Sequence, residues 1–135
     1  MKSYTDLEQS EKLAGILPIT TIDFAWNIFS DGSTRLLRMD DWEVFENAKS
    51  DVEIVPCWSL AALLGVLPIV YTNNKKEICG PLHIDITDSE NPFALWYVNP
   101  LHKGSIVELK TNEYDNLLDA CVEMILKLKE NNILL

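Results

Sequence analysis

Hydrophobic and polar residues alternate along this chain with periods that change several times, which predicts a mixture of helices and strands. The most apolar stretch is 56–68, whose apolar positions cover every side of a helical wheel and which contains no charged residue. A helix that is apolar all round has to be buried. Ser59 is placed to cap the N-terminus of this segment, so we predict a buried central helix over 60–67.

Two further helices are predicted from apolar positions with helical spacing. The first covers about 6–14, where Thr5 and Glu8 fit a capping box. The second covers about 113–130, with Asn112 as its cap. Its apolar stripe, typical of an amphipathic helix, consists of Tyr114, Leu117, Leu118, Cys121, Met124, Ile125 and Leu128.

Most of the other segments have the pattern of strands joined by tight turns. Residues 22–29 and 34–39 flank an Asp-Gly turn, which predicts a β-hairpin. A short helix over 22–29 remains the alternative, because the apolar residues there also fall at i,i+4 spacing. The other predicted strands are 52–55, 69–72, 76–79, 82–87, 93–98 and 105–109.

The strand over 82–87 alternates cleanly between apolar and polar residues, so its two sets of side chains point to opposite faces. The apolar set, expected to face the core, is Leu82, Ile84 and Ile86, and the polar set is His83, Asp85 and Thr87. The strand over 93–98 is apolar on both faces, which places it centrally. We therefore predict an α+β fold in a single domain over 1–135. An antiparallel sheet of about three to five strands would pack with the buried central helix and the C-terminal amphipathic helix.

Composition limits the classes of partner. The 135 residues carry a formal net charge of −10, from 21 acidic and 11 basic side chains. Such a surface repels phosphates, so we expect no direct binding of nucleic acid. The same charge suits a basic protein partner, or an inhibitor that imitates nucleic acid.

The expected location is the cytoplasm. The first residues contain no apolar h-region, so no secretory signal is expected. The uncharged run at 54–74 is interrupted by two prolines that leave a helix of only about 16 Å. A bilayer core needs about 30 Å, so no membrane span is expected. Three dispersed cysteines, Cys57, Cys79 and Cys121, indicate free, buried thiols in a reducing compartment.

Candidate chemistry is sparse, and no cofactor motif is present, so no cofactor is expected. His83 and Asp85 share one strand face, and with His102 they could bind a metal ion and support a metal-assisted hydrolase. The alternative interpretation of His83 and Asp85 is the solvent face of an amphipathic strand.

Surplus aromatic residues offer a different kind of site. Trp26, Trp42 and Tyr97 are candidate partner-binding residues, because two of them on one surface patch would indicate an interface. The alternative for these three side chains is ordinary core packing.

One segment resembles a known family. Residues 56–68, PCWSLAALLGVLP, resemble the P-x-W-S-L-x-A-L-L-x-x-L-P signature of a family of small proteins from gut bacteria and their prophages. Residues 8–13 and 119–124 resemble that family's E-Q-S-x-K-L start and D-A-x-V-E-M ending. The signature consists of packing residues, so the resemblance implies a shared fold and a mobile-element origin and leaves the function open.

From these observations we predict a small, non-enzymatic intracellular protein. It would bind a protein partner and act as a prophage accessory factor. Two alternatives remain open. One is a metal-assisted hydrolase that uses His83, Asp85 and His102. The other is an acidic inhibitor that imitates nucleic acid.

Overall fold

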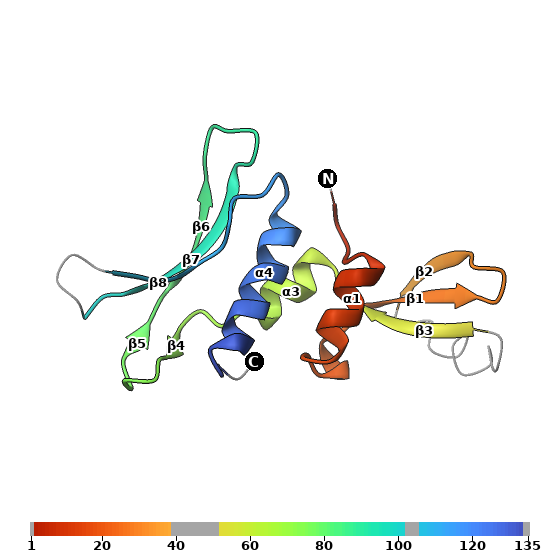
Figure 1. Cartoon of the computed structure of the whole chain (residues 1–135), viewed down its shortest axis with the longest axis horizontal. Helices are drawn as coiled ribbons and strands as arrows, with labels where there is room; N and C mark the ends of the chain where they lie inside the picture. Colours follow the sequence, from red (N-terminus) through yellow and green to blue (C-terminus); the bar gives the residue numbers. More distant parts are fainter. Residues whose placement is uncertain (1, 39–51, 102–105, 134–135) are drawn as a thin grey trace. The chain divides into compact units, whose positions relative to one another are not determined.

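The structure, a computed structural model, describes residues 2–38, 52–101 and 106–133. The chain divides into an N-terminal unit, Ser3–Ala62, and a C-terminal unit that combines Met1–Lys2 with Leu63–Leu135. Helices and antiparallel sheets are present, and an amphipathic helix lies near the C-terminus (Figure 1), so the predicted α+β class is confirmed. The expectation of a single domain over 1–135 stays a prediction.

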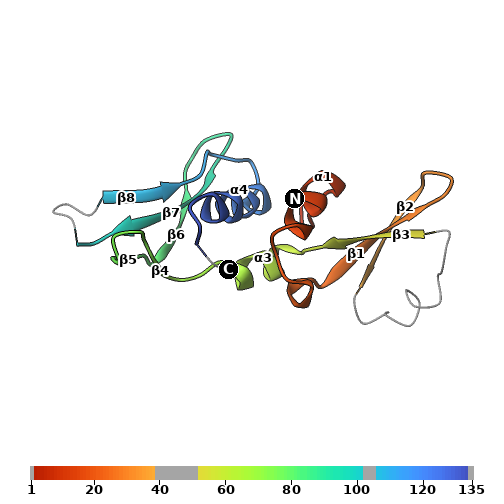
Figure 2. The same ribbon diagram turned by 60° about the horizontal axis from the view of Figure 1, so that its bottom comes forward.

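The N-terminal unit is a three-stranded antiparallel sheet with the strand order β2-β1-β3. Helix α1 packs against β3, and Figures 1 and 2 both show it beside this sheet. The predicted hairpin is therefore confirmed, and the alternative of a short helix over 22–29 is wrong. The elements of this unit are α1 (Leu7–Ala14), a 3₁₀ helix (Ile19–Thr21), β1 (Phe24–Phe29), β2 (Thr34–Arg38) and β3 (Val52–Cys57).

The turn between β1 and β2 explains why this segment is extended. Asp31 accepts hydrogen bonds from the backbone N–H and the hydroxyl of Ser33, at 2.9 and 2.6 Å. Gly32 follows Asp31 with φ +86°, which glycine adopts without a Cβ clash. The backbone N–H of Phe29 then donates to the Ser33 carbonyl at 2.9 Å, which closes the hairpin.

The first helix is where the sequence places it, but its cap is Asp6 rather than Thr5. Asp6 accepts a hydrogen bond from the Gln9 N–H at 2.8 Å, and the Gln9 side chain accepts from the Asp6 N–H at 3.1 Å. Thr5 is fully buried instead, with its hydroxyl bonded to that of Ser10 at 2.7 Å and accepting from the Trp58 N–H at 3.1 Å. The prediction of the cap was wrong because Thr5 and Asp6 are adjacent and either side chain could cap α1. Thr5 is buried in the core instead.

Trp58 is the largest fully buried side chain of the N-terminal unit. It is fully buried, and its indole N–H donates to the Thr21 hydroxyl at 2.9 Å. The backbone of Thr5 pairs with that of Trp58, since its N–H donates to the Trp58 carbonyl at 3.0 Å. The residues before α1 are therefore joined to the end of β3 by main-chain and side-chain hydrogen bonds.

Helix α3 (Leu60–Val66) begins at the predicted cap. The Ser59 hydroxyl accepts a hydrogen bond from the Ala62 N–H at 3.1 Å, as expected of an N-cap. The carboxylate of Asp23 in turn accepts from the Ser59 N–H at 2.9 Å and from its hydroxyl. Ser59 is therefore a structural cap that Asp23 holds in place.

Burial of this helix is one-sided, which corrects the prediction that it is buried on every side. Leu63 is fully buried, whereas Leu64 is 36% exposed, and Ala61 and Gly65 are also exposed. The helix has only about two turns, so a single row of side chains, continued by Leu67, reaches a core.

The C-terminal unit contains a three-stranded antiparallel sheet of order β6-β7-β8 and a separate two-stranded hairpin of β4 and β5. The strands within the described ranges are thus divided among three sheets rather than joined in one. Helix α4 packs on β7 and β8, and Figures 1 and 2 show it beside the sheet. The elements of this unit are β4 (Tyr71–Thr72), β5 (Ile78–Cys79), β6 (Leu82–Ile86), β7 (Phe93–Asn99), β8 (Ile106–Lys110) and α4 (Leu117–Glu130).

Helix α4 begins about four residues later than predicted, with Asn116 as its cap instead of Asn112. Asn116 accepts from the Asp119 N–H at 2.9 Å. Tyr114 cannot join the helix, because its backbone forms a β-bridge with Phe93 through bonds of 2.8 and 2.9 Å. The apolar stripe is largely confirmed, with Leu118, Cys121, Met124, Ile125 and Leu128 all buried. No helix within the described ranges is long and apolar enough to cross a bilayer.

Gly80 permits a close chain approach that starts the β6 strand. Its φ is +134°, and a Cβ there would lie 2.7 Å from the Ile69 carbonyl oxygen and 2.8 Å from the Val70 side chain. Only glycine fits this position, so the segment Ile69–Val70 lies directly against it.

We predict that Leu63→Ala lowers the free energy of unfolding by about 2–5 kcal/mol, because it leaves a cavity at a fully buried position. The neighbouring Leu64→Ala is the matched control and should cost less than about 1 kcal/mol, since that side chain is partly in water. Urea denaturation measures both values. A cost below about 1 kcal/mol for Leu63→Ala would contradict the observed burial.

We further predict different effects on stability for two glycine-to-alanine substitutions. Gly80→Ala should destabilise the protein by more than about 1 kcal/mol, through the clash with Ile69 and the positive φ. Gly65→Ala should be neutral or stabilising by up to about 1 kcal/mol, because nothing lies within 4 Å of the added Cβ and alanine favours helix. Equal effects in thermal or urea melts would be incompatible with this geometry.

Candidate functional site

Strand β6 is an outer strand of its sheet and pairs with β7 on one side. On that side the Thr87 N–H donates to the Pro92 carbonyl at 2.9 Å. The Leu82 N–H donates in the other direction, to the Ile69 carbonyl at 2.8 Å. Because the main-chain groups of successive strand residues point alternately to the two sides, the even-numbered residues of β6 point away from β7.

Ile84 and Ile86 are the two positions beyond Leu82 at which the main chain points outward, and we call this pair of positions the β6 edge. In the described part of the chain, their N–H and C=O groups have no hydrogen-bond partner. Their side chains are 45% and 68% exposed. The β6 edge therefore offers unpaired backbone groups next to exposed apolar side chains.

This exposure corrects the prediction that Ile84 and Ile86 face the core. The alternation assigns the faces correctly, since Ile84 lies across from Leu95, which is fully buried on β7. However, α4 packs on β7 and β8 and does not extend over the outer strand enough to bury it. Periodicity predicts which side chains share a face, but not how far a covering helix reaches.

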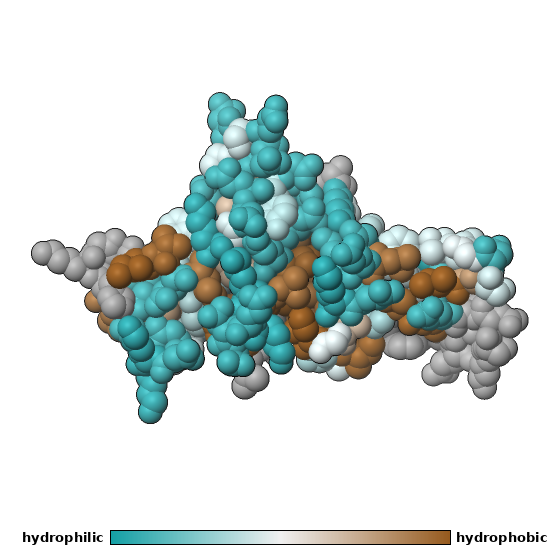
Figure 3. All heavy atoms as spheres, viewed as in Figure 1, coloured by the Kyte–Doolittle hydropathy of each residue, from teal (hydrophilic) through white to brown (hydrophobic). Residues whose placement is uncertain are grey.

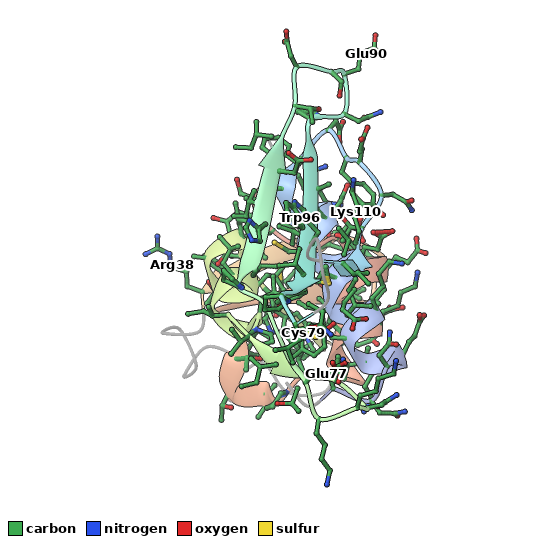
Figure 4. All side chains as sticks on the ribbon, turned by 90° about the vertical axis from the view of Figure 1, so that its left-hand side faces the viewer. Arg38, Glu77, Cys79, Glu90, Trp96 and Lys110 are labelled. Carbon is green, nitrogen blue, oxygen red and sulfur yellow. The ribbon has the colours of Figure 1, made fainter. Side chains whose placement is uncertain are left out.

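The opposite face of the same strand carries His83 and Asp85, both half-buried. The His83 ring is stacked on Trp96 of β7, with ring centroids 4.2 Å apart and planes 15° apart. Figure 4 shows Trp96 midway along the two strands, between Glu90 at the hairpin tip and the end where Cys79 lies. Asp85 follows two residues after His83 and points to the same face of the sheet.

The metal-site hypothesis gains no third ligand from this geometry. His102 lies outside the described residues. Within the described ranges, no group of three or more His, Cys, Asp or Glu side chains is placed to hold a metal ion. The hydrolase built on His83, Asp85 and His102 stays a prediction.

Of the three aromatic candidates, Tyr97 is the one that the structure removes from the surface. Tyr97 is fully buried, and its hydroxyl donates to the Pro68 carbonyl at 2.7 Å. Trp26 is half-buried and donates its indole N–H to the Thr5 carbonyl at 2.9 Å. Trp26 and Tyr97 belong to different units, and Trp42 lies outside the described residues. Sequence reasoning missed Trp96, because its position against His83 depends on a strand register that no local pattern specifies.

A polar cluster joins the β4–β5 hairpin to the larger sheet. Asn99 is fully buried, and its side-chain NH₂ donates to the carboxylates of Glu77 and Glu108, both at 3.1 Å. Asn73 donates to the same two carboxylate oxygens, also at 3.1 Å. Two amides thus hold together two carboxylates that would otherwise repel each other, which is a structural role.

A pocket of about 200 Å³ opens beside this cluster. It is lined by Tyr71, Asn73, Asn74, Lys75, Glu108, Leu109, Asn131 and Ile133. Sites for small organic ligands are usually larger, about 300 Å³ or more. The pocket is therefore too small to be the leading candidate.

The cysteines are unsuited to nucleophilic catalysis. All three are free and buried. Burial raises the pKa of the Cys121 thiol to about 12, and burial is also the main cause of the raised pKa of Cys57 and of Cys79. Each thiol is therefore protonated at neutral pH, whereas the thiolate is the reactive form.

A second exposed apolar patch lies at the β8 end of the C-terminal unit. It contains Leu101, Ile106 and Val107, exposed by 69%, 50% and 47%. Figure 3 shows hydrophobic residues gathered over this end of β8 and hydrophilic residues over the β6–β7 hairpin tip. Residues 102–105, which separate Leu101 from Ile106 in the sequence, are outside the described ranges, so the patch is not assigned as a site.

The β6 edge thus combines exposed apolar side chains with outward-facing main-chain groups within the described residues of the C-terminal unit. No protein-family model, curated protein or solved structure matches this chain. What the structure shows is an open sheet edge, and the geometry of that edge carries the functional proposal.

We predict that iodoacetamide alkylates Cys57, Cys79 and Cys121 at least tenfold more slowly at about pH 7.5 in the native protein than in urea. A raised pKa lowers the thiolate fraction at any given pH. The labelling rate of the native protein should therefore keep rising with pH well above the pH at which the labelling rate of an ordinary thiol levels off. Ser30→Cys supplies an exposed reference thiol. Native labelling of a buried thiol at the reference rate would contradict the prediction.

Proposed function

We propose that this protein binds another protein by adding an extended segment of that partner to its sheet at the β6 edge. The observation that carries the proposal is the outward-facing main chain of Ile84 and Ile86 beside their exposed side chains. Strand addition supplies affinity through main-chain hydrogen bonds and specificity through alternate side chains. This proposal agrees with the non-enzymatic binding role predicted from the sequence.

Two observations favour a different protein over a second copy of this chain as the occupant. An antiparallel pair of β6 edges that uses Ile84 and Ile86 of both copies would place Asp85 directly across from Asp85 of the other copy. Like charges in directly opposite positions are destabilising. Each copy also carries a net charge of −10, which opposes self-association.

We propose in addition that the protein acts in the cytoplasm as an accessory factor of prophage or mobile-element origin. The free state of all three cysteines supports a reducing compartment. The resemblance of residues 56–68 to the prophage-associated family supports the origin.

The proposal predicts that Ile84→Pro abolishes binding of extended peptides while leaving the fold intact. Proline removes the outward N–H of residue 84, and a strand tolerates proline where its N–H does not join the ladder. The probes are peptides selected from a random display library on the immobilised protein. Ile84→Thr is the matched control, since it keeps the N–H, and it should weaken binding without abolishing it.

Hydrogen exchange gives an independent readout in the unmutated protein. The amides of Ile84 and Ile86 should exchange rapidly in the free protein and become protected when a selected peptide binds. The proposal would be refuted by selected peptides that bind the Ile84→Pro variant as tightly as they bind the unmutated protein. Peptides that bind but leave the amides of Ile84 and Ile86 unprotected would also refute it. Failure of the library to yield any binder would also count against it.

A further inference from the structure

A strand added at the β6 edge meets two chemically different faces. Its successive side chains point to opposite sides, as in any strand. One set lies beside Ile84 and Ile86, on the face shared with α4. The other set lies beside His83 and Asp85, on the opposite face. The partner segment therefore has to carry two kinds of side chain in alternation.

The face of Ile84 and Ile86 requires apolar side chains. Both isoleucines are substantially exposed, so an apolar neighbour on each side would remove hydrocarbon from water. The Ile69 carbonyl already accepts a hydrogen bond from the outward N–H of Leu82, at 2.8 Å. An added strand therefore has to end before this position. The contact is consequently short, and its apolar part involves about two positions.

The face of Asp85 requires positive charge. Asp85 is half-buried and forms no ion pair with any residue in the described part of the chain. The ring of His83, two residues before it on the same strand face, is already stacked on Trp96 of β7. Asp88 and Glu90 are exposed in the hairpin loop, beyond the end of the strand.

From this geometry, and on the basis of the proposed function, we infer that the partner segment alternates apolar and cationic residues. Its apolar side chains lie along Ile84 and Ile86, and its lysine or arginine side chains lie beside Asp85. The net charge of −10 assists the encounter with such a segment. Specificity then depends on the order of the residues and not on their composition alone.

The test uses three labelled peptides of about seven residues, with blocked ends, measured by fluorescence anisotropy. The first alternates valine and lysine, the second alternates valine and glutamate, and the third contains the residues of the first in two blocks. Only the first can place all lysines on one face of an added strand. It should bind at least tenfold more tightly than either of the others.

Substitution of one carboxylate locates the charge effect. Asp85→Asn should weaken binding of the valine–lysine peptide about three- to tenfold. Asp88→Asn is the matched control, with the same change of net charge in the loop, and should have an effect below about twofold. Equal losses for the two variants would overturn the assignment to Asp85, because they would indicate attraction to net charge alone.

The outcomes separate this inference from the proposed function. Binding that requires the Ile84 N–H but shows no preference for the alternating lysine peptide would overturn the inference and leave strand addition in place. Binding that survives Ile84→Pro, with Ile84 and Ile86 amides unprotected in hydrogen exchange, would overturn both. Support for both requires loss of binding in Ile84→Pro, amide protection, and the selective effect of Asp85→Asn.

Discussion

The close approach of the Ile69 carbonyl to Gly80 and Leu82 is the constraint on which the rest of the C-terminal unit depends. It requires a glycine, because a Cβ at position 80 would meet the Ile69 oxygen at 2.7 Å. It also satisfies the outward N–H of Leu82, so the exposed part of the strand begins only at Ile84. The same few atoms therefore close one end of the sheet edge and leave the other end accessible.

Helix and strand identity followed closely from the sequence, since it depends on local periodicity and turn chemistry. The Asp-Gly turn, the cap at Ser59 and the amphipathic stripe of α4 are of this kind. The caps of α1 and α4 were predicted less well. At the start of each helix, two polar residues could serve as the cap. Tertiary contacts decided the choice, namely the burial of Thr5 and the bridge between Phe93 and Tyr114.

The candidate site could be predicted only in part. His83 and Asp85 were correctly placed on one face, because alternation along a strand is local. The stacking of His83 on Trp96 and the exposure of Ile84 and Ile86 depend on strand register and on how much of the sheet α4 covers. Long-range packing sets both quantities, and the hydrophobic pattern of 82–87 alone suggests the opposite burial.

The buried thiols have a practical consequence for following motion in this protein. Cys57 lies in β3, Cys79 in β5 and Cys121 in α4, so each belongs to a different structural element. One falls in the N-terminal unit and two in the C-terminal unit. The natural chain thus contains three built-in reporters, and the order in which they become accessible under mild denaturant would reveal which parts open separately and which open together.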